Sequence, residues 1–288
     1  MLTNGDGVLK VANEAGFAVP AFNISDYAMF AGIAELCEEL QAPWIVAIHP
    51  DEYDHIGPDM IKAILARAYR SSVPMAIHLD HGGTYEQVLT SIQNGYTSVM
   101  IDASVKPFEE NVAITKKVVE TAHAVGLSVE GELGTIGAND SYGESGATEV
   151  IHTTPEDAVT FVEQTGVDSL AIAIGTFHGL YPAGMKPELK LDLLKEIKAA
   201  VPIPLVLHGG SNNPDREIGI AARTGINKIN ISSDIKVAYH SKMREVLGDD
   251  PKLREPLMIQ LACVEAMNVV AAQKIELFGA AGKAELYR

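Results

Sequence analysis

The sequence contains little cysteine and far fewer basic than acidic residues. Only two cysteines, Cys37 and Cys263, occur in 288 residues, so we expect no disulfide framework and interpret both as buried hydrophobic side chains. Lys and Arg number 22 against 38 Asp and Glu, which gives a formal net charge of −16. Nucleic acids and anionic membranes require a positive surface, so neither is expected as a partner. A phosphorylated ligand would depend on local backbone amides and on a metal.

Targeting, membrane-spanning and linker segments are also lacking in the sequence pattern. The opening residues MLTNGDGVLKVANEAG have neither the basic nor the continuous apolar part of a signal peptide. No later stretch is expected to have the apolar length that a bilayer requires, and no Ser/Gly-rich or Pro-rich tract divides the chain. The sequence therefore predicts a soluble, cytoplasmic protein with a single domain over residues 1–288.

Short apolar runs alternate with longer segments of helical periodicity, which is typical of repeated β-α units and a parallel sheet. The runs predicted to be strands are the eight at 17–22, 43–48, 73–79, 97–101, 127–133, 168–174, 203–208 and 226–231. Helices are predicted over 26–41, 59–71, 84–94, 108–125, 155–165, 188–200 and 214–223. Because a TIM barrel has eight strands, the pattern predicts the α/β class and a (β/α)8 TIM barrel with extra C-terminal helices.

The extra helices are predicted at about 232–247 and 252–275, and the C-terminal helical extension covers about 248–288. They are expected to pack outside the barrel or against another subunit. Two longer inserts, 134–153 and 175–187, interrupt the regular alternation of strands and helices. Long loops of a barrel usually belong to its active face, so we expect both inserts there.

Polar residues gather where the predicted strands end, which is the face of a barrel that carries active sites. Three of them are histidines, and three neutral imidazoles with an open fourth position are typical of a catalytic zinc site. The predicted zinc ligands are His81, His178 and His208. His78 lies on the same strand as His81 and is interpreted as structural or as a support for a ligand. The remaining histidines, His49, His55, His123, His152 and His240, are interpreted as surface, helix or peripheral loop residues.

Two Gly- or Ser-containing segments indicate a phosphate site. His208-Gly209-Gly210-Ser211 follows the seventh strand and Asn230-Ile231-Ser232-Ser233 follows the eighth, where barrels commonly bind phosphate with loop amides and a helix N-terminus. Taken singly, the glycine pair could be a tight turn and the serines a helix cap. Their occurrence after adjacent strands favours phosphate.

Several of these segments resemble one enzyme family. HLDHG at 78–82, SVMIDAS at 98–104, VEGELG at 129–134, SLAIAIGTFHGLY at 169–181, PLVLHGGS at 204–211 and KINISSD at 228–234 look like the class II, zinc-dependent ketose-bisphosphate aldolases, the fructose- and tagatose-bisphosphate group. The match runs in order from the first strand to about residue 285. The resemblance implies a lyase of carbohydrate metabolism that reversibly cleaves a phosphorylated ketose to dihydroxyacetone phosphate and an aldehyde.

The resemblance also implies roles for individual residues. Asp80, just before His81, would act on the substrate hydroxyl or aldehyde oxygen, and Asp102 and Glu132 would offer a second or alternative metal position. The residues expected at the dihydroxyacetone phosphate site are Gly179, Gly209, Gly210, Ser211, Asn230, Ile231, Ser232 and Ser233. A monovalent cation, Na⁺ or K⁺, near the phosphate and a homodimer or homotetramer are usual among relatives.

Two positions depart from the family pattern. The family's proton-abstracting glutamate lies on the loop after strand five, and here the matching position is Asp140, so either Asp140 or Glu144 would take the proton; both could equally be solvated loop acids. Ser232 stands where fructose-type enzymes commonly have an acidic residue and tagatose-type enzymes a small one. The identity of the aldehyde half is therefore left open, with a sugar acid or another phosphorylated ketose as alternatives.

Three other functions are weighed against a zinc-dependent aldolase. A non-catalytic, aldolase-like assembly subunit would have no use for Asp80 and the three histidines. A Schiff-base aldolase would use Lys228 on the eighth strand, although an internal, salt-bridged lysine would also account for that residue. A metal-dependent hydrolase on the same barrel would release no aldehyde.

Overall fold

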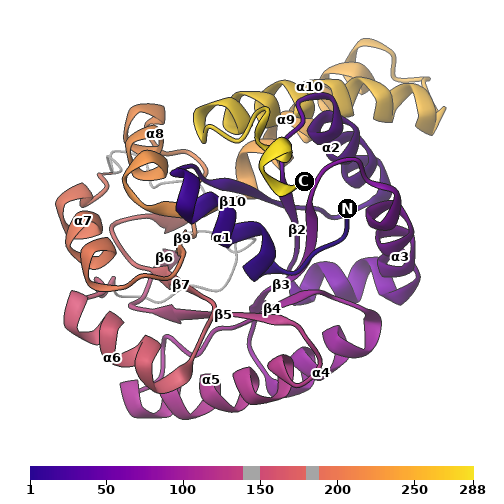
Figure 1. Ribbon diagram of the computed structural model, residues 1–288. Coiled ribbons are helices and arrows are strands. Elements are labelled where there is room, and N and C mark those ends of the chain that lie inside the picture. Colours follow the sequence, from indigo (N-terminus) through magenta and orange to yellow (C-terminus); the bar gives the residue numbers. More distant parts are fainter. Residues whose placement is uncertain (139–149, 180–187) are drawn as a thin grey trace.

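Eight parallel strands close into a barrel in this computed structural model, which describes residues 1–138, 150–179 and 188–288 (Figure 1). Around the barrel the order is β1-β10-β9-β7-β5-β4-β3-β2, so strands that follow one another along the chain are neighbours. The strands are β1 (Val19–Asn23), β2 (Trp44–Ile48), β3 (Met75–Gly82), β4 (Ser98–Ile101), β5 (Ser128–Leu133), β7 (Ser169–Ile172), β9 (Leu205–Leu207) and β10 (Ile226–Ile231). All eight overlap the predicted runs, and the predicted TIM barrel is confirmed.

The helices of the outer layer also follow the sequence pattern. They are α2 (Tyr27–Glu39), α3 (Pro50–Arg70), α4 (Tyr85–Asn94), α5 (Phe108–His123), α6 (Pro155–Thr165), α7 (Leu191–Ala200) and α8 (Asp215–Thr224). Asp26, Thr84 and Thr154 cap the first turns of α2, α4 and α6 through their side chains. α3 begins well before the predicted residue 59, because His49 caps an extra turn and Gly57, with φ of 70°, lets the helix kink and continue.

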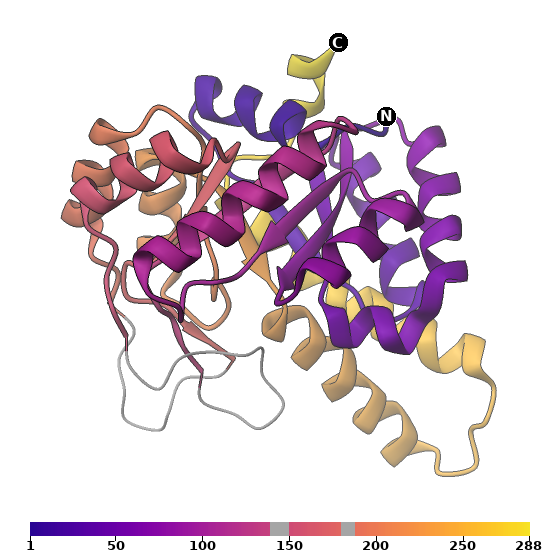
Figure 2. The same cartoon turned by 90° about the horizontal axis from the view of Figure 1, so that it is seen from below.

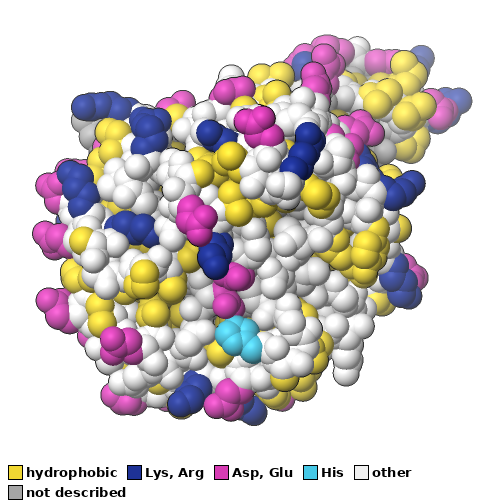
Figure 3. Space-filling view, in the orientation of Figure 1, with side chains coloured by type: hydrophobic (Ala, Val, Ile, Leu, Met, Phe, Trp, Pro, Cys, Tyr) yellow, Lys and Arg dark blue, Asp and Glu magenta, His cyan; other side chains and the backbone are white. Residues whose placement is uncertain are grey.

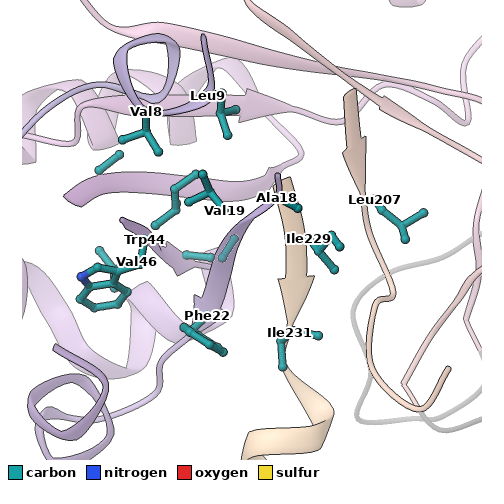
Figure 4. Close-up of a cluster of buried hydrophobic side chains, with 14 of the residues drawn as sticks. Val8, Leu9, Ala18, Val19, Phe22, Trp44, Val46, Leu207, Ile229 and Ile231 are labelled. Carbon is teal, nitrogen blue, oxygen red and sulfur yellow. The ribbon is translucent and has the colours of Figure 1, made fainter. Parts of the chain in front are cut away.

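The sequence did not predict α1 (Gly5–Ala15), which lies across the N-terminal end of the barrel (Figure 1). Its buried residues Val8, Leu9 and Ala12 face the ends of several strands, and the Gly5 amide donates to Ser128 Oγ at 2.8 Å. Figure 4 shows Val8 and Leu9 beside Val19 and other apolar side chains at the start of the strands. The helix thus closes the end of the barrel that lies opposite the predicted site.

Two short strands link the predicted inserts outside the barrel sheet. β6 (Gly137–Ala138) pairs in parallel with β8 (Phe177–His178), so that Ala138 lies opposite His178. The backbone segments that follow β5 and β7 are therefore held together at the C-terminal face.

Near its end the chain forms two helices, α9 (Ser233–Asp249) and α10 (Pro256–Leu277), which together we call the helical arm. The short 3-10 helix η1 (Lys283–Tyr287) follows and is not part of the arm. The arm projects from the side of the barrel (Figure 2), and α10 packs against α9 and α2 through residues that include Cys263 and Met267. The expectation that no stretch has the apolar length of a membrane span is wrong for α10, which meets that criterion by length and composition. Only 17% of its apolar window is buried within the chain.

Candidate active site

Asp80 is held at the C-terminal end of the barrel by two asparagine amides. Asn23 Nδ2, at the end of β1, donates to one carboxylate oxygen at 2.8 Å, and Asn230 Nδ2, on β10, donates to the other at 2.8 Å. Asp80 is fully buried. Burial alone would raise the pKa of this carboxyl, but the charges of His81 and His208 lower it well below its ordinary value. Asp80 is therefore an ionised, rigidly oriented carboxylate.

His81 stands at an irregularity of β3 that turns its side chain toward the site. Its backbone has φ of 51°, a left-handed conformation that is strained for a residue other than glycine, and the register with β4 shifts between Leu79 and Gly82. The ring centroids of His81 and His208 lie 4.4 Å apart. Neighbouring residues of a regular strand point to opposite faces, so this bulge allows Asp80 and His81 to reach one site.

Two overlapping groups of donors surround His81. Ligand atoms of Asp80, His81 and His208 lie within 4.8 Å of one another, and so do those of His81, Asp102 and Glu132. Asp102 Oδ2 is 3.1 Å from His81 Nδ1, and Glu132 Oε2 is 3.8 Å from the same nitrogen. Of the five metal ligands predicted from the sequence, the structure thus brings four together: His81, His208, Asp102 and Glu132.

The charge balance of this cluster fits a bound cation. Burial and the neighbouring charge of Asp102 raise the pKa of Glu132 well above its ordinary value. Within the described residues, Glu132 Oε2 has no hydrogen-bond partner, and no Lys or Arg forms an ion pair with Asp80, Asp102 or Glu132. A divalent ion would compensate these buried carboxylates, and imidazole and carboxylate are suitable ligands for it.

His208 is oriented from inside the barrel by a buried ionic network. Its Nε2 lies 2.8 Å from Glu130 Oε1, and Lys228 Nζ donates to both oxygens of Glu130 at 3.0 and 2.8 Å. With its Nε2 proton donated to Glu130, His208 keeps Nδ1 as the acceptor nitrogen, and this atom lies 3.9 Å from Asp80 Oδ1. Burial lowers the pKa of His208 below its ordinary value, which favours the neutral ring that a metal needs.

His78 and Lys228 complete this network below the cluster. Lys228 Nζ lies 3.2 Å from His78 Nε2, and His78 Nδ1 lies 2.8 Å from Ser98 Oγ, which agrees with a structural role for His78. Burial and the charge of Lys228 lower the pKa of His78 to about 3. Lys228 is fully buried and its ammonium group forms an ion pair with Glu130. The structure therefore favours a salt-bridged lysine over a Schiff-base nucleophile.

Three predicted site residues are described in part or not at all. His178 is the second residue of β8, at the C-terminal face, and the structure describes its backbone alone. Asp140 and Glu144, the two candidates for proton abstraction, lie outside the described residues. Gly179 directly follows His178 and has φ of 78°, a backbone conformation that favours glycine.

The loop after β9 approaches its neighbours so closely that it requires glycine. A Cβ atom on Gly209 would lie 2.4 Å from Phe177 O, and one on Gly210 would lie 2.8 Å from Asn230 O. The Gly210 amide is used within the protein, since it donates to Asn230 O at 3.2 Å. The buried hydroxyl of Thr176, which the sequence analysis passed over, lies beside this loop and has no hydrogen-bond partner among the described residues.

The helix N-terminus after β10 completes the predicted phosphate region. Ser232 and Ser233 begin α9, and Ser232 makes no side-chain capping bond, so the alternative that it is simply a helix cap is not supported. Ile231 is buried in the core, which leaves its backbone as the part that can face a ligand (Figure 4). The Asp234 amide donates to Ser211 Oγ at 3.3 Å and thereby joins the two segments.

Besides Thr176, sequence reasoning missed Asn23 and His49. Asn23, the residue after the predicted strand at 17–22, was given no role, although a polar residue at the end of an apolar strand could have indicated it. His49 was interpreted as a surface, helix or peripheral loop residue. It caps α3, but its ring centroid lies 6.4 Å from that of His81 and its side chain is 14% exposed.

Comparisons with known proteins agree on the kind of enzyme that this barrel resembles. A model of the family described as "Fructose-bisphosphate aldolase class-II" matches residues 3–283. A fructose-bisphosphate aldolase from Thermus caldophilus is 38% identical over 99% of this chain and its own full length. The crystal structure of the YdjI aldolase from Escherichia coli K12 superposes with a TM-score of 0.87 and 33% identity, over 99% of this chain and 100% of that one.

Proposed function

We propose, because this chain belongs to the class-II fructose-bisphosphate aldolase family, that it is a zinc-dependent aldolase that reversibly cleaves a phosphorylated ketose. The products would be dihydroxyacetone phosphate and an aldehyde. The observation that carries this proposal is the buried cluster of Asp80, His81 and His208, with Asp80 fixed by two amides. A non-catalytic assembly subunit would have no need to orient an ionised carboxylate in this way.

The proposed zinc ligands are His81, His178 and His208, with Asp102 and Glu132 as a second or alternative position. When bound, the ion supplies a Lewis acid that polarises the ketone carbonyl and compensates negative charge that develops on its oxygen. Glu130 accepts the Nε2 proton of His208, so Nδ1 of His208 would be the ligand atom. Asp102 bonds Nδ1 of His81, so Nε2 of His81 would be the ligand atom.

Asp80 is proposed to move the proton on the oxygen of the aldehyde half. In cleavage the ionised carboxylate takes the hydroxyl proton as the carbon–carbon bond breaks, and in synthesis it returns that proton to the aldehyde oxygen. The lowered pKa of Asp80 keeps the carboxyl ionised in the resting state, as the first role requires. The other proton, on the carbon next to the ketone, is assigned to a carboxylate of Asp140 or Glu144.

The substrate phosphate is proposed to bind between the loop after β9 and the start of α9. Gly179, Gly209, Gly210 and Ser211 would form one side, and Asn230, Ile231, Ser232 and Ser233 the other. Because the Gly210 amide already bonds Asn230 O, we assign phosphate binding to other amides of the loop, to the α9 N-terminus and to the Thr176 hydroxyl. A monovalent cation, Na⁺ or K⁺, would offset the charge of the phosphate.

Proton exchange separates the first half of this reaction from the second. In deuterated water, the zinc-loaded protein should exchange a carbon-bound proton of dihydroxyacetone phosphate, and addition of an aldehyde should yield a ketose phosphate. Asp80→Asn should retain zinc and lose turnover by at least about a hundredfold, since the general base is removed. Absence of exchange in the native, zinc-loaded protein, or full turnover by Asp80→Asn, would reject the proposal.

We further propose that the protein forms a cytoplasmic homodimer or homotetramer through the helical arm. Leu257, Met258 and Leu261 on α10 are 68%, 61% and 62% exposed, and apolar side chains gather on the projecting arm in Figure 3. Leu261 also lines a groove of about 540 Å³ between α2 and α10. A second copy of the chain is the occupant we favour, since the net charge of −16 opposes an anionic membrane.

A further inference from the structure

His49 stands next to the proposed catalytic centre although the reaction described above gives it no task. It directly follows β2, whose residue Ile48 is in register with Leu79 of β3, so His49 lies beside Asp80 at the same end of the barrel. Its ring is 6.4 Å from that of His81. A histidine at this distance from the cluster has the reach to contact a substrate bound there.

The position of the His49 ring is fixed by the start of α3. Its Nδ1 accepts a hydrogen bond from the Asp51 amide at 3.2 Å, and Glu52 Oε2 accepts one from the His49 amide at 3.2 Å, which together form a capping box. Glu52 Oε1 in turn accepts from Ser25 Oγ at 2.9 Å and from Lys236 Nζ at 2.6 Å. Glu52, which holds His49, is thus tied to the loop after β1 and to the first turn of α9.

These bonds determine which ring nitrogen of His49 can donate a hydrogen bond to a ligand. Because Nδ1 accepts from Asp51, the proton of the neutral ring lies on Nε2, which is then a hydrogen-bond donor. Among the described residues, no group bonds to Nε2.

The place of His49 in the barrel indicates which part of a substrate it meets. The proposed phosphate site lies at β9 and β10, whereas His49 follows β2, which is separated from β10 by β1 and adjoins the strand of Asp80. Asp80 acts on the oxygen of the aldehyde half, so His49 lies on that side. The nearby ammonium of Lys236 is engaged by Glu52, and a neutral N–H donor suits an uncharged oxygen better than a phosphate.

We propose that His49 is a specificity-determining residue whose Nε2–H donates a hydrogen bond to a hydroxyl oxygen of the acceptor aldehyde. This inference rests on the proposed aldolase function and adds a substrate class to it: polyhydroxylated aldehydes, selected over aldehydes that lack hydroxyls. The imidazole neither transfers a proton nor binds the metal in this role.

Two aldehydes of equal carbon number provide the test. Glyceraldehyde and propanal differ by two hydroxyls, and kcat/KM for each is measured with the zinc-loaded protein at saturating dihydroxyacetone phosphate. His49→Ser keeps an oxygen that can cap α3 but removes the imidazole N–H, and the serine hydroxyl lies too close to the backbone to replace it. We expect the glyceraldehyde-to-propanal ratio of kcat/KM to fall about tenfold, the effect of one lost hydrogen bond. His49→Asn, which has both a capping oxygen and an N–H donor, should restore part of the ratio.

Further measurements distinguish the possible failures. His55→Ser, the same change at an exposed position of α3, should leave the ratio unchanged. Proton exchange on dihydroxyacetone phosphate alone should fall much less in His49→Ser than the rate with glyceraldehyde. Equal losses with both aldehydes, or an unchanged ratio, would overturn the proposal for His49 while leaving the aldolase assignment intact. A native protein without exchange would instead overturn the proposed function and this inference with it.

Discussion

Glu130 connects a proposed metal ligand to a buried lysine, and each of its partners depends on it for a different reason. His208 needs the carboxylate to fix which nitrogen is protonated, and Lys228 needs it as a counter-ion. All three side chains are almost fully buried. Removing the charge of Glu130 should therefore affect both metal binding and stability.

Glu130→Gln is expected to weaken zinc binding about tenfold to a hundredfold and to lower the free energy of unfolding by several kcal/mol. Competition with a chromophoric chelator measures the first effect and urea unfolding of the metal-free protein the second. In the double variant with Lys228→Met, stability should recover while zinc affinity stays low, because the unpaired buried ammonium is gone. Glu14→Gln, at an exposed position, should change neither. Native zinc affinity in Glu130→Gln would contradict the assigned role.

Single residues also show how far the sequence predicts the site. His81 and His208 were identified because each lies where a predicted strand ends, and parallel strands bring their ends to one face. The roles of Asp80, Asp102 and Glu132 were expected from the resemblance to the aldolase family. His49 also follows a predicted strand directly, but the position of its ring depends on the first turn of α3 and on Glu52, which the sequence pattern did not reveal. The alignment of Glu130 with Lys228 depends on which side chains point into the barrel, and their distances follow only from its closure.

At the scale of elements, helices that begin at a side-chain cap and end at glycine matched the sequence most closely. α6 has the predicted bounds, with Thr154 as its cap and Gly166 after its last turn. α1 was not predicted because its hydrophobic residues serve to close the barrel rather than to cover its outside. Local patterns do not distinguish these two uses.

The contact between α2 and α3 supports a prediction about pH. Arg67 donates to both carboxylate oxygens of Glu38 at 2.7 Å, and the two side chains are 22% and 24% exposed. Arg67→Ala should lower the free energy of unfolding by about 1 kcal/mol at pH 7. The hydrogen bond from Arg67 lowers the pKa of Glu38. The difference between native and variant proteins should therefore persist above about pH 4.3, the unfolded pKa, and disappear as pH falls through the folded pKa.

Urea unfolding at neutral and acidic pH measures this dependence. Lys62→Ala provides the control, because Lys62 pairs with Asp59 on the same helix but is largely exposed, and its removal should have no measurable effect. If Arg67→Ala lowers the free energy of unfolding by the same amount at every pH at which the protein is folded, the ion pair is not the cause of the loss.

At the scale of the whole molecule, the alternation of strands and helices was enough to predict the barrel. The arrangement of the helical arm was not predictable, because the same apolar periodicity fits a helix buried in the chain and one that awaits a partner. α10 combines a buried side, including Met267 and Ile275, with exposed residues such as Leu261. The composition of the helix therefore also satisfies the criterion for a membrane span.

The helical arm yields a prediction of oligomeric state. The native protein should have the mass of a dimer or tetramer in size-exclusion chromatography with light scattering, and Leu261→Glu should shift it to monomer by placing charge in the apolar contact. Leu286→Glu, at another exposed leucine outside the arm, should leave the mass unchanged. A monomeric native protein, or one that sediments with neutral lipid vesicles, would contradict self-association through α10.

The closure of the N-terminal end of the barrel by α1 limits where substrates can enter and where products can leave. Val8, Leu9 and Ala12 pack across the N-terminal end, and the buried side chains of Glu130 and Lys228 fill the barrel between that end and the site. Substrates must then enter, and products leave, at the C-terminal face of the barrel. If one of the two products binds nearer the barrel interior, it can leave only after the other has left.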